Sequence, residues 1–167
     1  LIMVTDQKIN TIQDILPVLE EVVKANKALL IIADDYDNEV MSTLIINKLR
    51  GTFNVVATKA PGFGDNAKNM LGDIATVTGA NFFAKDLSAN LSEMTVNDLG
   101  GAKKVVVGKD KTTIIGGKGD KDAVAERVSE IRGAIENTTS DYDKKKLLER
   151  LGKLTNGIAV IKVGATT

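Results

Sequence analysis

The sequence contains no cysteine, no histidine and no tryptophan among its 167 residues. Without cysteine it has no disulfide and no thiolate nucleophile. Without histidine it has no imidazole general base, no Ser-His-Asp triad and no ordinary structural zinc site. A metal ion would have only oxygen ligands available. These absences exclude enzymes that depend on a thiolate or an imidazole, and they exclude an ordinary zinc site.

Charge of one sign and long apolar runs are also lacking. The 22 basic and 22 acidic residues cancel to a formal net charge of zero, so no electrostatic footprint for a phosphate backbone is visible and we expect no nucleic-acid partner. The longest apolar stretch, residues 28–33, is far shorter than the roughly 20 residues of a membrane span. No signal-peptide pattern opens the sequence, and we expect no membrane partner.

Size and composition indicate one globular domain with an aliphatic core, because hydrophobic residues make up 43% of the chain but aromatic residues only 4%. The sequence begins with Leu1 rather than Met, inside an expected strand. We therefore expect a piece of a longer chain.

The first two thirds alternate between short apolar runs and amphipathic stretches. The pattern predicts strands at 1–4, 28–33, 53–60 and 81–84, and helices at 14–25, 39–50 and 65–78. Asp14 and Asn38 are the candidate N-caps of the first two helices, Pro17 falls in a first turn, and Gly51 and Gly79 follow helix ends. Strands that alternate with helices predict an α/β fold with a mostly parallel or mixed sheet flanked by helices.

The last third predicts a different arrangement. A capping box at 95–98 starts a short helix, and short strands are expected at 104–107 and 112–115 around a Gly-Lys-Asp-Lys turn. Amphipathic stretches at 122–137 and 140–154 predict an antiparallel helical hairpin, with Ser140 and Asp143 as a second capping box. Asn156-Gly157 closes the hairpin, and a strand is expected at 158–163.

Gly62-Phe63-Gly64 is the strongest candidate for a cofactor site. It matches G-x-G-x-x-A, follows a strand, opens a helix and has Asp86 about 20 residues further on, as in a dinucleotide-binding turn. Pro61 and Asp65 argue against this interpretation, because Asp65 places a carboxylate where a pyrophosphate would approach the helix N-terminus. A purely structural glycine-rich connection is the alternative.

Two other patterns suggest binding only weakly. Residues 116–120 are rich in glycine but lack the G-x-x-x-x-G-K-[ST] spacing of a Walker A loop, so we interpret them as a flexible loop. Asp34, Asp35, Asp37 and Glu39 could bind calcium through oxygen, but they lack the glycine and final glutamate of an EF-hand. A solvated turn that complements a helix dipole is the simpler interpretation.

The helix at 39–50 has more apolar residues than one buried face requires. They span an arc of about 240° at 100° per residue, whereas a helix that lies on a sheet needs a stripe of about 100°. The excess is either covered by a neighbouring element or exposed as a binding surface. If this helix lies beside the helix at 14–25, the rims of the two helices form an apolar groove.

Several motifs in order along the chain resemble the GroEL-type (group I) chaperonins: residues 47–51 (NKLRG), 59–65 (KAPGFGD), 112–115 (TTII), 139–143 (TSDYD) and 159–164 (AVIKVG). The resemblance covers essentially the whole chain. It implies the apical domain, which binds substrate and the co-chaperonin GroES, over residues 1–158. Residues 159–167 would begin the return strand into the intermediate domain.

The resemblance also implies a function and a site. In that family, non-native polypeptides and the GroES mobile loop bind in the groove between the two helices described above. The matching apolar positions are Leu16, Leu19, Met41, Ile45 and Ile46, and the matching polar rim positions are Glu20, Asn47 and Arg50. The adaptable side chain of methionine suits a surface that accepts many partners. The glycine turn at residues 62–64 is structural in the family.

The remaining expectations also follow from the resemblance. The parent chain is expected to form a double-ring homo-oligomer that uses ATP and magnesium in an equatorial domain outside this chain, so we expect no cofactor and no enzymatic activity here. The isolated chain is expected to be monomeric. Compartments that house the family are the bacterial cytoplasm, which we take as the expectation, the mitochondrial matrix and the chloroplast stroma. A dinucleotide-binding enzyme domain and a purely structural segment are the alternatives.

Overall fold

A computed structural model describes residues 1–62, 64–108 and 111–156 of the chain, and the backbone of 158–162. The helices are α1 (Leu16–Lys24), α2 (Asn38–Leu49), α3 (Gly64–Thr78), α4 (Lys121–Asn137) and α5 (Asp141–Thr155). The strands are β1 (Ile2–Val4), β2 (Lys8–Ile9), β3 (Leu29–Ala33), β4 (Asp35–Tyr36), β5 (Val55–Lys59), β6 (Ala102–Val107), β7 (Lys111–Gly117) and β8 (Ile158–Lys162). Short 3-10 turns lie at Ile12–Asp14, Lys85–Leu87, Leu91–Glu93 and Val96–Asp98.

The strands form a mixed set of small sheets, which confirms the α/β class. β1, β3 and β5 make a parallel sheet in the order β1-β3-β5, and β2 pairs with β4 in a parallel pair. β6, β7 and β8 make an antiparallel sheet. The expected return strand therefore lies, over its described residues, in the ladder with β7.

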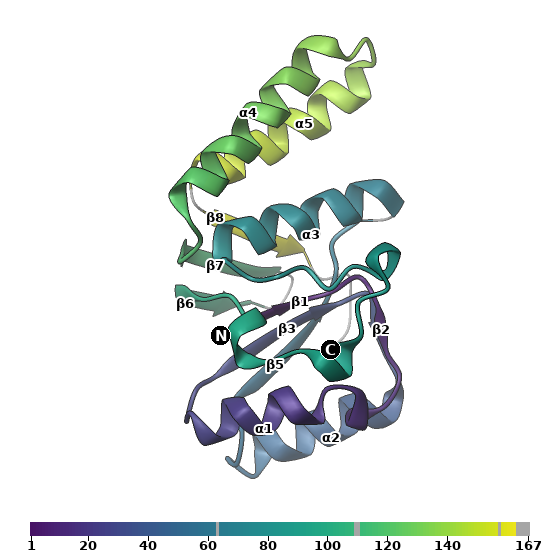
Figure 1. Ribbon diagram of the computed structural model, residues 1–167, viewed down its shortest axis with the longest axis vertical. Helices are drawn as coiled ribbons and strands as arrows, with labels where there is room; N and C mark the ends of the chain where they lie inside the picture. The colour runs from purple at the N-terminus through teal and green to yellow at the C-terminus, as the bar shows by residue number, and fades with distance from the viewer. Residues whose placement is uncertain (63, 109–110, 157, 163–167) are drawn as a thin grey trace.

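The parallel sheet has helices on both faces, and the alternation of side chains along each strand explains the two cores. Met3, Ile31 and Val55 point toward α1 and α2 and join the larger apolar cluster. Their neighbours Val4 and Ile32 point the other way and pack with α3 and β7. Figure 1 shows the resulting layers, with α1 and α2 below the sheet and α3 above it. The hairpin of α4 and α5 lies beyond α3.

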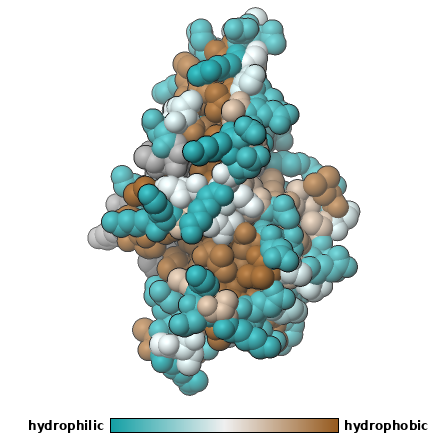
Figure 2. Space-filling model, turned by 60° about the vertical axis from the view of Figure 1, so that its left-hand side comes forward, coloured by the Kyte–Doolittle hydropathy of each residue, from teal (hydrophilic) through white to brown (hydrophobic). Residues whose placement is uncertain are grey.

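The predicted hairpin is confirmed, and it is only partly buried. Ser140 caps α5 by accepting a hydrogen bond from the Asp143 backbone N–H at 3.2 Å. A small cluster of Val77, Val128, Ile131 and Leu154 joins the hairpin to α3. Figure 2 shows hydrophobic atoms that remain visible along the hairpin at the top of the view, between hydrophilic flanks. The hairpin thus keeps part of its apolar face exposed.

Helix ends account for most differences from the predicted boundaries. Asp14 is not the N-cap of α1: it ends a 3-10 turn, and α1 begins at Leu16 with Pro17 in the first turn, as predicted. The N-cap of α2 is Asp37 rather than Asn38, because the Asp37 carboxylate accepts the Glu39 backbone N–H at 3.0 Å. Gly51 and Gly79 follow α2 and α3 with φ values of 71° and 81°, which glycine adopts without strain.

Other predicted features are confirmed, replaced or lie outside the described residues. The capping box at Thr95 and Asp98 is present. The strand predicted at 81–84 is wrong: only Phe83 forms a bridge there, with Thr5, because this stretch runs into a 3-10 turn instead of a ladder. Phe63, the turn residues 109–110, Gly157 and residues 163–167 lie outside the described part of the chain.

Candidate binding groove

Helices α1 and α2 lie side by side on one face of the parallel sheet (Figure 1). Both are anchored by one buried stripe: Val18 and Val22 in α1, and Val40 and Leu44 in α2, are all buried in the larger cluster. Leu19 is also buried there and Met41 packs against the cluster, but Leu16, Val23, Ile45, Ile46 and Leu49 are exposed. The two helices therefore present surplus apolar side chains to their surroundings.

A hollow of about 460 Å³ lies between the two helices. This volume falls in the range of roughly 300–1,000 Å³ that ligand sites occupy. Its lining is mostly apolar, with one acidic and one basic side chain: Ile12, Leu16, Leu19, Glu20, Val23, Lys24, Thr43, Leu44, Asn47, Thr52 and Phe53. We call this the α1–α2 groove. It can bind an apolar side chain of another polypeptide.

Four of the eight predicted site residues line the α1–α2 groove: Leu16, Leu19, Glu20 and Asn47. Leu16 is exposed, whereas Leu19 is buried and forms part of the floor. The structure thus brings together three predicted residues of α1 and one of α2 in the same hollow.

The other four residues do not line the groove. Met41 is partly buried against the core. Ile45 and Ile46 of α2 are exposed, and so is Arg50, which directly follows the helix. At 100° per residue, Ile45 lies about 160° around the helix from Asn47, so the two cannot face α1 together. We call Ile45, Ile46 and Leu49 the outer face of α2.

Polar contacts hold the α2 wall of the groove in place. The Asn47 side-chain amide donates to the Thr43 carbonyl oxygen at 2.8 Å, and the Thr52 hydroxyl donates to the Asn47 carbonyl oxygen at 3.0 Å. The bond from Thr52 satisfies a carbonyl group in the last turn of α2, and the bond to Thr43 fixes the Asn47 side chain against the helix. On the other wall, the Glu21 carboxylate accepts the Val96 backbone N–H at 2.7 Å and ties α1 to a distant turn.

Sequence reasoning missed part of the lining. Val23, Thr43 and Phe53 line the groove but were not among the predicted site residues. A signal existed for α1, where Ile12, Leu16, Leu19 and Val23 follow helical spacing. No comparable signal existed for Phe53, which follows α2 in a loop and lies near the helix only in the folded chain.

The turn at Gly62 and Gly64 is an unsuitable site for a dinucleotide. Both glycines have positive φ, and the hollow beside them is lined by Asp6, Asp34, Asp65 and Asp86, with Lys68 paired to Asp86. Four carboxylates and one paired cation repel a pyrophosphate. The geometry therefore favours the structural interpretation of this turn.

The acidic turn after β3 is explained by local structure. Asp35 pairs with Lys59 at 3.2 Å and accepts the Tyr36 backbone N–H at 2.9 Å. That backbone hydrogen bond, supported by Lys59, lowers the pKa of the Asp35 carboxyl. Asp37 caps α2, as described above. Within the described residues no group of three or more acidic side chains is arranged to hold a metal ion.

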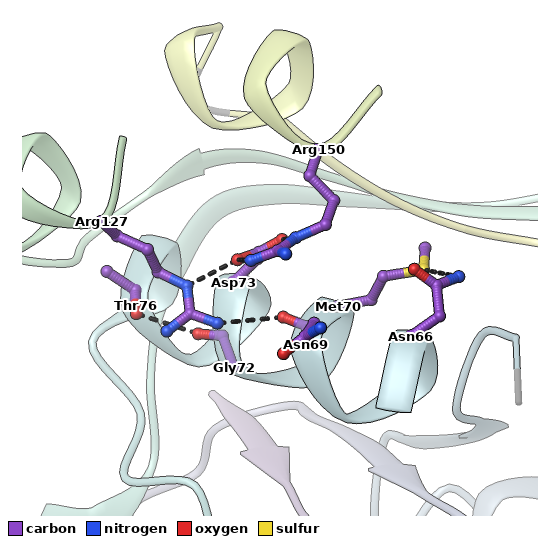
Figure 3. Close-up of polar contacts among 8 residues, drawn as sticks. All are labelled: Asn66, Asn69, Met70, Gly72, Asp73, Thr76, Arg127 and Arg150. Carbon is purple, nitrogen blue, oxygen red and sulfur yellow. Dashed lines mark hydrogen bonds and ion pairs between the residues drawn. The ribbon is translucent and has the colours of Figure 1, made fainter. Parts of the chain in front are cut away.

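A buried ionic cluster joins α3 to the hairpin, and no sequence motif predicted it. Asp73 of α3 accepts hydrogen bonds from Arg127 Nε at 2.5 Å and from Arg150 Nε at 2.7 Å and Nη2 at 2.9 Å (Figure 3). Arg127 also donates to the Asn69 carbonyl oxygen at 3.0 Å. We call Asp73, Arg127 and Arg150 the Asp73 hub. It lies on the opposite side of the sheet from the α1–α2 groove.

The chain is similar to a known protein over almost its whole length. The chain is 68% identical over 166 residues to the chaperonin GroEL of Acholeplasma laidlawii (strain PG-8A). The alignment covers 99% of this chain but only 31% of that protein, so the chain spans about a third of the length of this relative. A comparison with models of known protein families gives no match.

The fold is also similar to solved structures. Two crystal forms of the chaperonin gp146 from the bacteriophage EL 2 (Pseudomonas aeruginosa), in the presence of ATP-BeFx, match 99% of this chain with TM-scores of 0.63 and 0.55. The match covers 34% and 33% of those chains, and at 18% identity it shows the fold alone. Together with the sequence match, it confirms the resemblance of this chain to the GroEL-type chaperonins. No helix in the described part of the chain is long and apolar enough to cross a membrane.

Proposed function

Because the chain is similar along its whole length to a segment of GroEL-type chaperonins, we propose that it is the apical, polypeptide-binding part of such a chaperonin. Its role is to bind non-native polypeptides and the mobile loop of a GroES-type co-chaperonin. The observation that carries the proposal is the α1–α2 groove, where exposed apolar side chains line a hollow large enough for a ligand. Residues 1–158 form this part, and 159–167 start the return strand to an intermediate domain.

The physical basis of capture is the burial of apolar surface. Each Å² of apolar surface removed from water contributes about 25 cal/mol. Non-native chains expose apolar side chains that native proteins bury, so a groove without strict hydrogen-bond requirements selects them. The hydrogen bonds of Asn47 and Thr52 go mainly to backbone groups of the chain itself, which leaves the groove dependent on shape and apolar contact.

The outer face of α2 supplies a second apolar surface for the same purpose. Ile45 is 48% exposed and Leu49 81% exposed. A polypeptide seated in the α1–α2 groove and continued across α2 would cover both surfaces. Contact with both would bury more apolar area than the hollow alone, at the cost of ordering a longer segment.

The parent protein is proposed to act as an ATP-driven double ring in the bacterial cytoplasm, with ATP and magnesium bound outside this chain. Several grooves in one ring would bind one client together, and multivalency would raise the affinity without new contacts. The isolated chain, proposed to be monomeric, should therefore bind a single peptide weakly. It is not proposed to be an enzyme.

A titration of the chain with an apolar mobile-loop peptide, followed by heteronuclear NMR, tests the proposal. We expect shifts at Leu16 and Leu19, and loss of binding in Leu16→Glu, because a carboxylate would enter the apolar groove. Ile45→Glu should also weaken binding while the fold is kept. Leu148→Glu is the matched control, since Leu148 is 49% exposed but lies on the hairpin.

Each outcome has a definite meaning. Equal binding by Leu16→Glu and the unchanged chain would contradict the groove. Loss of thermal stability in Ile45→Glu equal to its loss of binding would place Ile45 in the core and contradict an outer face. Saturable binding of NAD, lost in Gly64→Val, would instead support the dinucleotide alternative. An exposed-hydrophobe dye that ignores the native chain would favour a purely structural segment.

A further inference from the structure

A second hollow lies between α3 and α5, away from the α1–α2 groove. It has a volume of about 190 Å³ and is lined by Pro61, Gly62, Asn66, Met70, Lys146, Glu149, Arg150 and Lys153. Lys146, Arg150 and Lys153 follow one another at i, i+4 and i+7, so they project from one face of α5. Three cations and one carboxylate thus surround a small cavity.

The Asp73 hub, to which Arg150 belongs, does not neutralise the positive charge of Arg150. Two guanidinium groups share the single carboxylate of Asp73, which leaves one positive charge without a counter-charge in the hub. The side chains of Asp73 and Arg150 are only 12% and 13% exposed, so water compensates this charge poorly. Arg150 uses Nε and Nη2 for Asp73. Among the contacts of the described residues, its Nη1 nitrogen makes no hydrogen bond.

The remaining charges of the hollow do not cancel this excess. Glu149 lies 3.9 Å from Lys146, a loose pair with both side chains more than a third exposed. Lys146 also lies 5.6 Å from the centre of the Tyr142 ring. Lys153 has no salt-bridge partner among the described residues, and its side chain lines the cavity. Lys153 and Arg150 are therefore the cations best placed to bind an anion.

From this arrangement we propose that the hollow between α3 and α5 binds an oxyanion of phosphate size. Arg150 and Lys153 supply the charge, and the Asn66 side-chain amide is the neutral donor in the lining. Asn66 makes only a weak contact of 3.6 Å with the Met70 sulfur, so its amide is available. Asp65, in the first turn of α3, lines the two neighbouring hollows but not this one.

The size of the hollow limits the ligand to the oxyanion itself. Its volume of about 190 Å³ lies below the roughly 300 Å³ at which drug-sized sites begin. A free phosphate ion fits, and the terminal phosphoryl group of a larger molecule fits only if the rest of that molecule stays outside. The adjoining hollow on the hairpin side shares Lys146 and Arg150 but adds Asp65 and Asp143, which cancel the positive charge.

Titration of the chain with inorganic phosphate in a low-salt buffer, followed by heteronuclear NMR, tests the proposal. We expect saturable shifts at Gly62, Asn66 and Lys153 while Leu16 and Leu19 stay silent. Lys153→Gln should weaken phosphate binding about tenfold, as for a lost charge-assisted hydrogen bond. Lys145→Gln, on the same helix but outside the lining, is the matched control and should leave the affinity unchanged.

Titrations with other anions distinguish a free phosphate ion from the phosphoryl group of a larger molecule. They also detect a general effect of ionic strength. Sulfate should compete with phosphate, and ATP should bind with an affinity similar to that of phosphate, which would support a phosphoryl-sized site. Much tighter ATP binding, with shifts that spread to Asp86, would overturn the size limit. Absence of saturation, or an equal loss in Lys145→Gln, would overturn the site. Peptide binding in the α1–α2 groove is measured separately and does not depend on this result.

Discussion

The two sides of the parallel sheet are held together in different ways. On one side, α1 and α2 are anchored by a large apolar cluster, and within the described residues neither helix takes part in an ion pair. On the other side, a second apolar cluster packs α3 on the sheet, whereas a small apolar cluster and the Asp73 hub join the hairpin to α3. The side with the largest apolar cluster also exposes apolar residues of α1 and α2 to solvent, among them Leu16, Ile45 and Leu49.

This difference separates stability from binding. Val40 and Leu44 anchor α2 from one stripe, so Ile45 and Leu49 contribute little to folding and are available to partners. The hairpin has few apolar anchors, so its attachment depends on charged groups that cannot be removed one at a time without cost. The following predictions test this separation, from the largest expected effect to the smallest.

The largest loss of stability is expected on the hub side. Asp73→Ala leaves two guanidinium groups uncompensated in a largely buried position, and breaking such a cluster costs about 3–5 kcal/mol of the free energy of unfolding. Chemical denaturation followed by circular dichroism measures the change. Asp141→Ala, at an exposed position in the first turn of α5, is the control and should cost less than 1 kcal/mol.

A second variant distinguishes the effect of the hub's charges on stability from the effect of the volume that its side chains fill. Replacement of all three members by apolar residues, Asp73→Leu with Arg127→Met and Arg150→Met, should recover most of the lost stability, because no unpaired charge remains. If this triple variant does not recover stability, the hydrogen bond from Arg127 to the Asn69 carbonyl oxygen also contributes much to the free energy of unfolding.

The next largest loss of stability is expected in α2, where a buried residue and an exposed residue are neighbours. Leu44→Ala removes a buried side chain from the larger apolar cluster and should cost about 2–5 kcal/mol. Ile45→Ala, one residue further on, should change the free energy of unfolding by less than about 0.5 kcal/mol. Denaturation curves of the two variants provide the measurement, and similar losses in both would break the separation of anchoring and binding faces.

The capping box near α1 should show a smaller, pH-dependent effect. The Thr95 backbone N–H donates to the Asp98 carboxylate at 2.9 Å and, with Asn81, lowers the pKa of Asp98 below its ordinary 3.8. A lowered folded pKa means that the ionised form stabilises the fold above about pH 4 and that this contribution is lost as pH falls through the folded pKa. Asp98→Ala should therefore cost about 1 kcal/mol at pH 7 and progressively less below pH 4.

Thermal unfolding of Asp98→Ala and the unchanged chain at several pH values measures this effect. A constant difference between the two at pH 7 and pH 3 would show that Asp98 acts without its charge. Its partner Asn81 offers a milder variant, Asn81→Ala, which removes one hydrogen bond and keeps the carboxylate.

The sequence was sufficient for the features that have a local cause. Alternation along β1 and β3 places their side chains on two faces, and the spacing of Val40 and Leu44 is that of a buried helical stripe. The surplus of apolar residues on α2 left two possibilities open, a covered face or an exposed one, and the structure exposes Ile45, Ile46 and Leu49. Sequence alone could not say which part of that surplus faces α1, because the rotation of α2 is determined by its packing. Ile45 was therefore placed in the groove, where the structure has Thr43 and Asn47.

The hub could not be predicted for a different reason. Asp73 lies 54 residues from Arg127 and 77 from Arg150 in the sequence. An aspartate within an amphipathic helix has no local signal that distinguishes a solvated position from a buried one. Only the packing of the hairpin against α3 brings the two arginines to it.

The smallest effect on stability is expected at the most exposed apolar residue of α2. Leu49 is 81% exposed, so Leu49→Gln should change the free energy of unfolding by no more than about 0.5 kcal/mol in either direction. The same change should weaken binding of an apolar peptide if the outer face of α2 takes part in capture, because it replaces apolar surface with an amide that prefers water. Leu87→Gln is the matched control, since Leu87 is 77% exposed but lies in a turn after α3. A stability loss above 1 kcal/mol that grows with protein concentration would show instead that Leu49 is covered by a second copy of the chain.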